Sequence, residues 1–518
     1  MVMINAIGRE IPGYIEGCGK PIPFAGVSAI RPEMQRYAPA IKLARPGESK
    51  LVPSLDEVFT RIPIRDGMTL SFHHHFRNGD RLVNAVLATA ARHGIRGLNV
   101  ALSAVFPVHA PIVDHVRTGV VRALDTNYIS GPVARGVSAG FFDRPVILRT
   151  HGGRARAIEC GQLKIDVAFI AASAADDYGN INGIGGPAAC GSLGYAFPDA
   201  EYADMVVAVT DHLVDYPLVP CSIPQTRVDY VVRVDRVGDP DGIVSGTTRM
   251  TSDPVQLKIA ETAAEVIQAA GLLKDGFSLQ TGAGGASLAA AHFVRRTMER
   301  SGVTGSFILG GITGYMVEML EQGLFRAIMD VQGFDLEAVR SLATNPNHIE
   351  VGAGFYANPF NAGCAVNRLD AVVLGATEID TDFNVNVVTG SDGIIMGGSG
   401  GHSDTAAGAK ITIIVARLIR GRIPTIVDRV LTATTPGQTI DVLVTDHGVA
   451  VNPARRDLAN RLMSAGLQVT DIHELKRIAE EITGARLRPP AGDKIVAAVE
   501  YRDGTIIDVV RQATGRKT

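Results

Sequence analysis

Short apolar runs alternate with amphipathic stretches along most of this 518-residue chain. The runs 166–172 (DVAFIAA) and 371–376 (AVVLGA) lack polar alternation, which is typical of strands buried within a parallel sheet. The stretches 253–271 and 287–300 place apolar residues at helical spacing, and glycine-rich turns precede such helices. This pattern predicts an α/β protein built on open sheets.

The second half of the chain repeats the first. Three blocks recur in the same order, 204 to 209 residues later. They are 64–87 with 273–294, 163–182 with 367–386, and CGSLG (190–194) with GGSGG (397–401). Because order and spacing are both kept, we predict two tandem α/β domains of the same fold.

Loop composition suggests where these domains begin and end. Residues 1–50 are rich in proline and glycine and are predicted as an extension. The stretch 237–244 (VGDPDGIV) separates the halves, which gives a first domain over 51–240 and a second over 241–518. The second domain is predicted to end in a hairpin that turns at Asp503 and Gly504.

Composition narrows the possible functions. The net charge is −3 and the isoelectric point is near 6.5, which argues against a general nucleic-acid or membrane-surface binder. Five scattered cysteines form no CxxC pair and are expected to be thiols in a reducing compartment. We find neither a signal-peptide pattern nor an apolar stretch of about 20 residues, and we expect a cytoplasmic protein.

The two copies differ where catalysis would need them to differ. At matched positions the first copy has Ala174 and the second has Glu378. His73–His75 of the first copy aligns with the glycine-rich stretch 282–284 of the second. Duplicated domains that face each other line a cleft with corresponding loops, and the two walls of an active site need different groups. Although a single Glu is usually a solvated surface residue, Glu378 follows a strand of the buried type.

Two glycine-rich loops accompany this Glu, TGAGGAS (281–287) and MGGSGGHSD (396–404). Glycine lets backbone N–H groups approach a ligand, and a carboxylate between two such loops suits acyl transfer. Phosphate-binding, nucleotide-binding and purely structural turns have similar sequences. The candidate residues for thioester or oxyanion binding are Gly282, Gly284, Gly285, Gly400 and Gly401.

The three consecutive histidines do not predict a metal site. Successive strand residues point to opposite faces, and neither a cysteine nor an acidic residue lies nearby to complete a ligand set.

Several motifs between about Pro53 and Val510 are characteristic of one family. They include SFHHHFRNGD (71–80), GFSLQTGAGGASLA (276–289), EIDTDFNVNVVTGSDG (378–393) and GGSGGHSDTA (397–406). These motifs carry a resemblance to the alpha subunit of citrate lyase. It implies two CoA-transferase-like domains of the NagB/RpiA type, which are Rossmann-like open sheets. This agrees with the repeat.

The resemblance also implies a reaction and partners. Acetyl-S-carrier and citrate would give citryl-S-carrier and acetate, and acetyl-CoA would serve as an alternative thioester. No cofactor would be bound in this chain. The expected partners are a beta subunit that cleaves citryl thioester and a gamma subunit that carries the acyl group, in an oligomeric complex.

The stretch ATEID (376–380) with GGSGGHSDT (397–405) resembles a wider group, the acetate and 4-hydroxybutyrate CoA-transferases. In those enzymes the matching Glu attacks the thioester, which implies that Glu378 is catalytic. The chain departs from their pattern at Ser403 and Thr405. Citrate lyase transferases are generally assigned direct attack by citrate, and this leaves the role of Glu378 open between nucleophile and positioning group.

Citrate carries about three negative charges, so the implied pocket needs fixed cations and hydrogen-bond donors. The substrate-binding candidates are His73, His74, His75, Arg77, His151, Arg154, Arg249, Asn384 and His402. Three alternatives stay open: a malonate or citramalate acyl-carrier transferase, a CoA-transferase with a covalent glutamyl intermediate, and a non-catalytic sensor of acyl-CoA or sugar phosphates.

Overall fold

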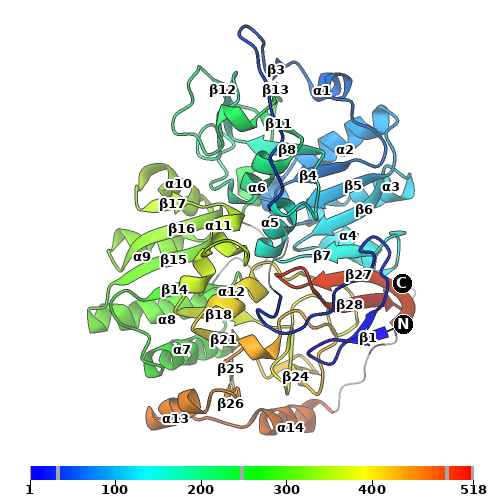
Figure 1. The fold of residues 1–518 in the computed structure, drawn as a ribbon. Coiled ribbons are helices and arrows are strands. Elements are labelled where there is room, and N and C mark those ends of the chain that lie inside the picture. The colour runs from blue at the N-terminus through cyan, green and yellow to red at the C-terminus, as the bar shows by residue number, and fades with distance from the viewer. Residues whose placement is uncertain (1, 31–35, 245–249, 485–488, 490, 515–518) are drawn as a thin grey trace.

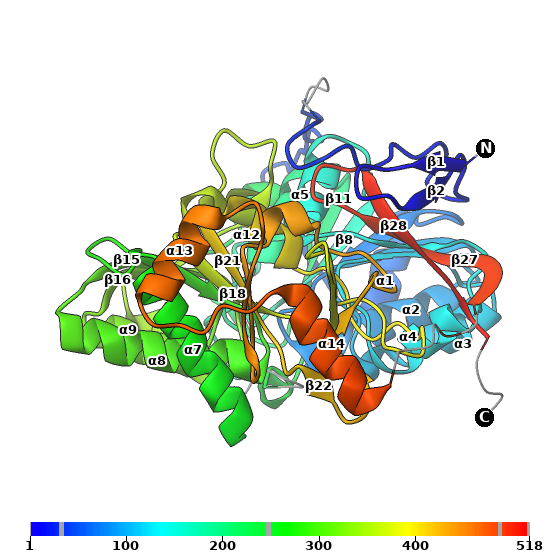
Figure 2. The ribbon, with the colours of Figure 1, turned by 90° about the horizontal axis from the view of Figure 1, so that it is seen from below.

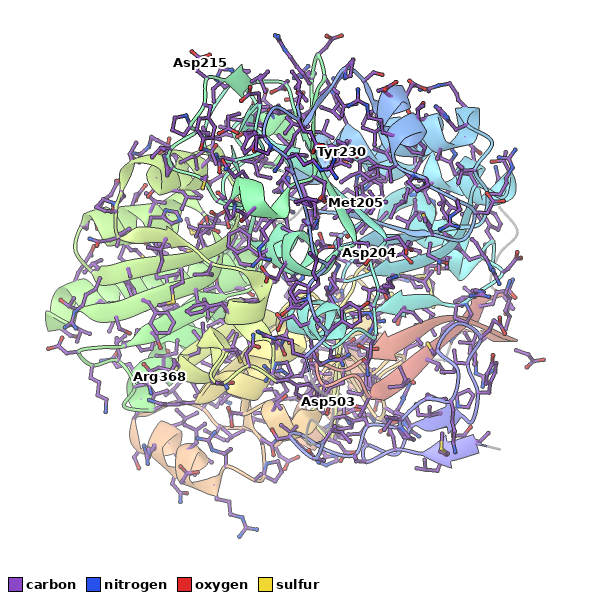
Figure 3. All side chains as sticks on the ribbon, turned by 45° about the horizontal axis from the view of Figure 1, so that its top comes forward. Asp204, Met205, Asp215, Tyr230, Arg368 and Asp503 are labelled. Atoms are coloured by element: carbon purple, nitrogen blue, oxygen red, sulfur yellow. The ribbon has the colours of Figure 1, made fainter. Side chains whose placement is uncertain are left out.

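Two large open sheets flanked by helices dominate the part of the chain that the structure describes, and each is built mainly from one half (Figure 1). The structure is a computed structural model and describes residues 2–30, 36–244, 250–484, 489 and 491–514. The two sheets lie side by side, and side chains fill the space between their ribbons (Figure 3).

Among the described residues the first sheet has ten strands, all parallel to their neighbours except at one edge. Their order is β28 (Ile506–Ala513), β27 (Ala491–Glu500), β7 (Val146–Leu148), β6 (Val121–Thr126), β5 (Leu98–Leu102), β4 (Thr69–Phe72), β8 (Val167–Ala172), β11 (Met205–Thr210), β13 (Tyr230–Arg233) and β3 (Leu51–Val52). Its helices are α1 (Leu55–Arg61), α2 (Leu82–Arg92), α3 (Ile112–Arg117), α4 (Gly131–Ser138), α5 (His151–Glu159) and α6 (Phe197–Tyr202).

In the part of the chain that the structure describes, the second sheet has eight strands, and only the last of these runs antiparallel to its neighbour. Their order is β17 (His348–Glu350), β16 (Phe325–Gly333), β15 (Gly305–Ile312), β14 (Ser278–Thr281), β18 (Ala371–Gly375), β21 (Ile411–Val415), β25 (Val442–Thr445) and β26 (Gly448–Val451). Its helices are α7 (Pro254–Ala269), α8 (Gly285–Ser301), α9 (Gly314–Glu321), α10 (Leu336–Thr344), α11 (Ala353–Ala357), α12 (His402–Gly408), α13 (Arg456–Ser464) and α14 (Ile472–Thr483).

The strand orders confirm the repeat and the predicted fold class. The series β7-β6-β5-β4-β8-β11-β13 corresponds strand by strand to β17-β16-β15-β14-β18-β21-β25. Each half also adds a small three-stranded sheet, built from β9 (Ala174–Asp176), β10 (Ile181–Asn182) and β12 (Leu213–Val214) in the first half. The second half builds its copy from β19 (Glu378–Asp380), β20 (Val385–Asn386) and β24 (Ile426–Val427).

The C-terminal hairpin differs from the sequence-based expectation. We expected it to end the second domain, but β27 pairs in parallel with β7 and extends the first sheet. The predicted turn is present, with Gly504 at a φ of +94° and Asp503 beside it (Figure 3). The open edge of β7 explains the placement, because its backbone N–H and C=O groups need a partner strand.

The N-terminal extension begins with a small hairpin, β1 (Val2–Ile4) and β2 (Glu10–Pro12), beside β28 (Figure 2). Further along, the N–H of Phe24 donates to Ile506 O at 3.0 Å, and the N–H of Ile506 donates to Ile22 O at 2.8 Å. Residues 2–24, which we call the N-terminal arm, therefore lie against the last strand of the chain.

The glycine-rich loops cross between the halves in a reciprocal way. Gly194 of the first half packs on the carbonyl oxygens of Val331 and Val351, at the ends of β16 and β17. Gly398 of the second half packs on the backbone of Asn127 and Tyr128, after β6. Because β16 corresponds to β6, each half inserts its loop at the same place on the other half, and we call this interface the seam.

This packing predicts the effect of a single added methyl group. In Gly194→Ala the new Cβ would overlap the carbonyl oxygen of Val351, so we expect a loss of about 1–3 kcal/mol in the free energy of unfolding. Gly333→Ala is the control, because there the nearest atoms lie 3.6 Å from the added Cβ. Equal stability of the two variants in urea unfolding would contradict this account of the seam.

Candidate functional site

Glu378 is fully buried at the start of β19. Its Oε2 accepts hydrogen bonds from Asn386 Nδ2 at 3.0 Å and from the N–H of Leu431 at 2.8 Å. In the first copy the matching residues are Ala174 and Asn182, and Asn182 Nδ2 donates to the carbonyl of Pro220 instead. The matching asparagine therefore donates to a backbone carbonyl in the first copy and to a carboxylate in the second.

Residues 431–435, here the threonine segment, connect Glu378 to the GGSGG loop. At one end, Leu431 donates to Glu378. At the other, Thr434 O accepts from Ser403 Oγ at 2.8 Å, and Thr435 Oγ1 bonds to His402 Nδ1 at 2.7 Å. The carboxylate and the first turn of α12 are thus held by the same five residues.

His402 joins the same loop to the end of β18. Its Nε2 lies 3.0 Å from the carbonyl of Gly375, three residues before Glu378. Burial lowers the pKa of His402 to about 4, so its ring is neutral at neutral pH. Both ring nitrogens are occupied within the protein, which favours a positioning role over the predicted contact with substrate.

The GAGG loop lies beside the same carbonyl end of β18. The N–H of Gly282 donates to Val373 O at 2.8 Å, but the N–H groups of Gly284 and Gly285 make no hydrogen bond within the described residues. The buried hydroxyls of Thr281 and Ser287, also without partners there, flank these amides. A helix N-terminus with unused donors is a site for an anion or an oxyanion, and buried polar groups without partners call for a ligand.

The GGSGG loop reaches across the seam. The N–H of Gly400 donates to Asn127 O at 3.1 Å, and Gly400 O accepts from the N–H of His151 at 2.8 Å. Gly401 has no room for a side chain beside the Tyr356 hydroxyl, and its N–H is not hydrogen-bonded within the described residues. Of the five candidate glycines, Gly284, Gly285 and Gly401 therefore keep an available amide.

His74 and His151 lie near this loop, and their rings and that of His75 are not cations at neutral pH. The His74 ring lies 4.6 Å from Tyr195 and 5.7 Å from His151, measured between centroids. Burial lowers the pKa of His151 to about 3 and that of His75 to about 4, and it also lowers the pKa of His74. At neutral pH these rings can donate hydrogen bonds but supply no fixed positive charge.

Arg154 is already paired inside the first half. Its Nη1 and Nη2 each lie 2.8 Å from an oxygen of Asp199, and His73 Nε2 lies 3.2 Å from the same carboxylate. All three side chains are buried. Burial would raise the pKa of Asp199, but Arg154 and His73 lower it below its usual value. The cluster secures the loop after β4 and leaves Arg154 little capacity to bind citrate.

The charged side chain of Arg77 lies at the seam, between rings of the two halves. Its guanidinium lies 5.0 Å from the ring centre of Phe106 and 4.9 Å from that of Phe334, which belongs to the second half. Burial lowers the pKa of Arg77 to about 10, so it stays charged at neutral pH. The backbone at Arg77 has a φ of +52°, an uncommon conformation for a residue other than glycine.

Two further candidates have different outcomes. Asn384 caps a turn, because its N–H donates to Asp380 Oδ1 at 2.8 Å and its own Oδ1 accepts from the N–H of Gly437 at 2.9 Å. The first copy repeats this turn with Asp176 and Asn180. Arg249 lies outside the described residues.

Asp404, which the sequence did not single out, fixes the GGSGG loop to the first half. Its Oδ1 accepts from the Thr150 hydroxyl and its Oδ2 from the N–H of Gly152, both at 2.9 Å. Burial raises the pKa of Asp404 to about 6, although the nearby Arg502 opposes this shift. The sequence contains a clue, since Asp404 lies three residues after the GGSGG loop (397–401), which aligns with CGSLG in the repeat.

Within the described ranges, no group of three His, Cys, Asp or Glu side chains is placed to hold a metal ion. The same residues include no helix that is long and apolar enough to cross a membrane.

Solved structures establish the class of fold. The chain is similar to a malonate decarboxylase alpha subunit from Acinetobacter baumannii, with a TM-score of 0.62 and 17% identity over 85% of this chain and 93% of that one. It is also similar to a 4-hydroxybutyrate CoA-transferase from Porphyromonas gingivalis, with a TM-score of 0.53 and 16% identity over 83% and 96% of the two chains. Its two sheets therefore have the CoA-transferase-like fold.

Sequence comparison gives the family. The family described as citrate lyase, alpha subunit (CitF), matches residues 48–513. The citrate lyase alpha chain of Klebsiella pneumoniae is 50% identical over 490 residues, 95% of each chain, and that of Escherichia coli K12 is 51% identical over 465 residues, 90% of this chain and 91% of that one. The chain belongs to the citrate lyase alpha subunit family, which confirms the family and the enzyme class that the motifs predicted.

A solved structure supports the same assignment. A Streptococcus mutans chain, described as an alpha subunit of citrate lyase in complex with citrate, has a TM-score of 0.94 and 47% identity, over 98% of this chain and 99% of that one.

The unpartnered hydroxyl of Ser287 leads to a prediction. Ser287→Ala removes no hydrogen bond made by the described residues, so the free energy of unfolding should stay within about 0.5 kcal/mol. If the hydroxyl binds the thioester substrate, the KM for that substrate should rise about 2- to 10-fold. Ser403→Ala is the control, since it loses a bond to Thr434 O and should destabilise the protein by about 1 kcal/mol. An unchanged KM in Ser287→Ala would exclude this contact.

The raised pKa of Asp404 predicts how the stability of the protein depends on pH. Between its ordinary value of 3.8 and about 6 the folded protein binds this proton more tightly than the unfolded chain, so its contribution to stability falls as the pH rises through that window. Asn cannot titrate. We therefore compare the free energy of unfolding of the unaltered protein with that of Asp404→Asn. The difference between the two should decrease from pH 4 to pH 6.5, by at most about 3 kcal/mol. A constant difference across this range would contradict the assignment.

Proposed function

We propose that this chain is the acyl-transferase subunit of a citrate lyase. It converts acetyl-S-carrier and citrate into citryl-S-carrier and acetate, and it also accepts acetyl-CoA. One observation carries the proposal: a buried Glu378, which accepts hydrogen bonds from Asn386 and Leu431, lies near the end of β18 beside the GAGG and GGSGG loops. Three amides of these loops make no hydrogen bond to any residue that the structure describes.

We propose direct attack by citrate rather than a covalent glutamyl intermediate, as the resemblance to citrate lyase transferases implies. In the first step a citrate carboxylate oxygen bonds to the acetyl carbon, and the carbon–sulfur bond breaks to give a mixed anhydride and the carrier thiolate. In the second step the thiolate attacks the citryl carbonyl of the anhydride, and acetate leaves. Each step builds negative charge on a carbonyl oxygen, which the amides of Gly284, Gly285 and Gly401 are suited to stabilise.

The remaining candidates divide by charge. Arg77 supplies the fixed cation for citrate, because it is charged at neutral pH and lies at the seam. His74 and His151 serve as neutral hydrogen-bond donors. Glu378 positions the reacting groups through its charge.

Cleavage of citryl thioester to oxaloacetate belongs to a separate beta subunit, and a gamma subunit carries the acyl group. The relatives are named alpha chains, as expected for one subunit of a multi-subunit enzyme. We infer an oligomeric, cytoplasmic complex, with the thioester as substrate and no resident cofactor in this chain.

The decisive variant is Glu378→Gln, which keeps the shape of the side chain but removes its charge. We expect kcat for acetyl transfer to citrate to fall at least about 100-fold. Asp382→Asn removes an exposed carboxylate from the same hairpin and should leave kcat unchanged. Near-normal turnover in Glu378→Gln would reject the site.

Borohydride treatment separates the two roles of Glu378. A glutamyl thioester would be reduced, which would inactivate the enzyme only after acetyl-CoA is added. We expect no such inactivation. Inactivation that depends on acetyl-CoA and maps to Glu378 would keep the site but establish the covalent mechanism.

A further inference from the structure

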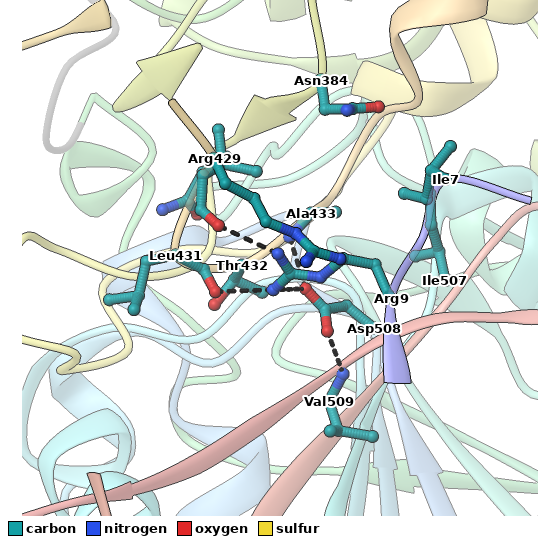
Figure 4. Close-up of polar contacts among 12 residues, drawn as sticks. Ile7, Arg9, Asn384, Arg429, Leu431, Thr432, Ala433, Ile507, Asp508 and Val509 are labelled. Carbon is teal, nitrogen blue, oxygen red and sulfur yellow. Dashed lines mark hydrogen bonds and ion pairs between the residues drawn. The ribbon is translucent and has the colours of Figure 1, made fainter. Parts of the chain in front are cut away.

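The N-terminal arm reaches the peptide group that holds Glu378. Arg9 lies between the threonine segment and the C-terminal hairpin, and its side chain is 12% exposed (Figure 4). Its Nη1 donates to Val430 O at 3.1 Å and its Nη2 to Leu431 O at 2.8 Å. The carbonyl of Val430 and the N–H of Leu431 belong to one peptide group, and that N–H donates to Glu378 Oε2.

Asp508 of β28 completes this contact. It forms an ion pair with Arg9, and its Oδ2 accepts from the N–H of Ala433 at 2.7 Å (Figure 4). The side chain of Asp508 is 4% exposed, so water competes little for the pair. Arg9 and Asp508 therefore hold three successive peptide groups, from the carbonyl of Val430 to the N–H of Ala433, at the start of the threonine segment.

The arm itself is well anchored. Asn5 is buried, its Nδ2 donates to Ile507 O at 2.8 Å, and its Oδ1 accepts from the N–H of Arg9 at 2.9 Å. The guanidinium is thus held in place before any substrate binds.

A cationic donor on a carbonyl polarises the peptide and strengthens the hydrogen bond made by its N–H. The bond from Leu431 to Glu378 would then be both oriented and strengthened by Arg9. Since the threonine segment also holds His402 and Ser403, the same contact sets the carboxylate relative to the GGSGG loop.

We propose that Arg9 is a positioning residue for the acyl-transfer site, acting on Glu378 through the Val430–Leu431 peptide. This inference rests on the proposed role of Glu378. It gives a function to an extension that lies outside both repeated domains, and it makes the arm part of the active enzyme although Arg9 touches no substrate.

The test uses full-length Arg9→Met, which keeps the length of the side chain and removes its charge and donors. We expect kcat to fall about tenfold, the scale of one hydrogen bond to a charged group, while the KM values for citrate and acetyl-CoA stay within about twofold. Arg9→Lys can pair with Asp508 and one carbonyl, and its kcat should lie between those of Arg9→Met and the unaltered protein.

The matched control is Arg429→Met. Arg429 also joins the two segments, through a bond from its guanidinium to Gly8 O, but it makes no bond to the Val430–Leu431 peptide. It should leave kcat unchanged. An equal loss in both variants would show that the arm acts only as general support, and would overturn the proposal.

Combination with Glu378→Gln separates positioning from simple stability. If Arg9 acts through Glu378, adding Arg9→Met or Arg9→Lys to Glu378→Gln should lower kcat no further. The inference would be overturned if Arg9→Met lowered kcat by the same factor in the unaltered protein and in Glu378→Gln, or if Arg9→Met were fully active.

If Arg9→Met does not fold, Arg9→Lys is compared in the same way with and without Glu378→Gln, and full activity of Arg9→Lys would likewise overturn the inference. Normal activity of Glu378→Gln alone would reject the proposed function, whereas a damaged Glu378→Gln with a normal Arg9 variant would reject only this inference.

Discussion

The close approach of two backbones at the seam determines the rest of the site. Gly398 and Gly194 each occupy a place where a Cβ would overlap a carbonyl oxygen of the other half. Only glycine permits this distance, and it brings Gly400 into hydrogen-bonding contact with Asn127 and His151. The GGSGG loop, the histidines and Arg77 then meet at one place, although they come from both repeats.

The reciprocal seam also explains how one fold supports two different walls. The two halves have corresponding strands, turns and loop insertions, so each wall of the site has the same backbone arrangement. The side chains on the two walls differ, and Glu378 opposite Ala174 is the clearest example. Divergence could be confined to side chains because the duplicated backbone already placed them.

Much of this could be predicted from the sequence, since the repeat, the strand types and the glycine loops are local patterns. The charge states of the histidines could not, because His151 and His402 are neutral only through burial that the tertiary fold creates. The hydrogen bond from Leu431 to Glu378 could not be predicted from the sequence, because every non-proline residue has a backbone N–H. Only the folded chain shows which of them donates to Glu378. The partner of the hairpin was missed for a similar reason: an apolar strand pattern does not specify which sheet edge it will join.

The pairing of β27 with β7 affects the order in which the chain can fold. During synthesis the first half emerges with β7 as an open sheet edge, and its partner lies about 350 residues later. Such a long-range pairing closes late, because loop closure must precede the contact that stabilises it. The first sheet is therefore complete only after residues 491–513 have been made, so the first repeat depends on a segment of the second half. Fusion of the halves into one polypeptide keeps the last strand available to the first sheet at a high local concentration.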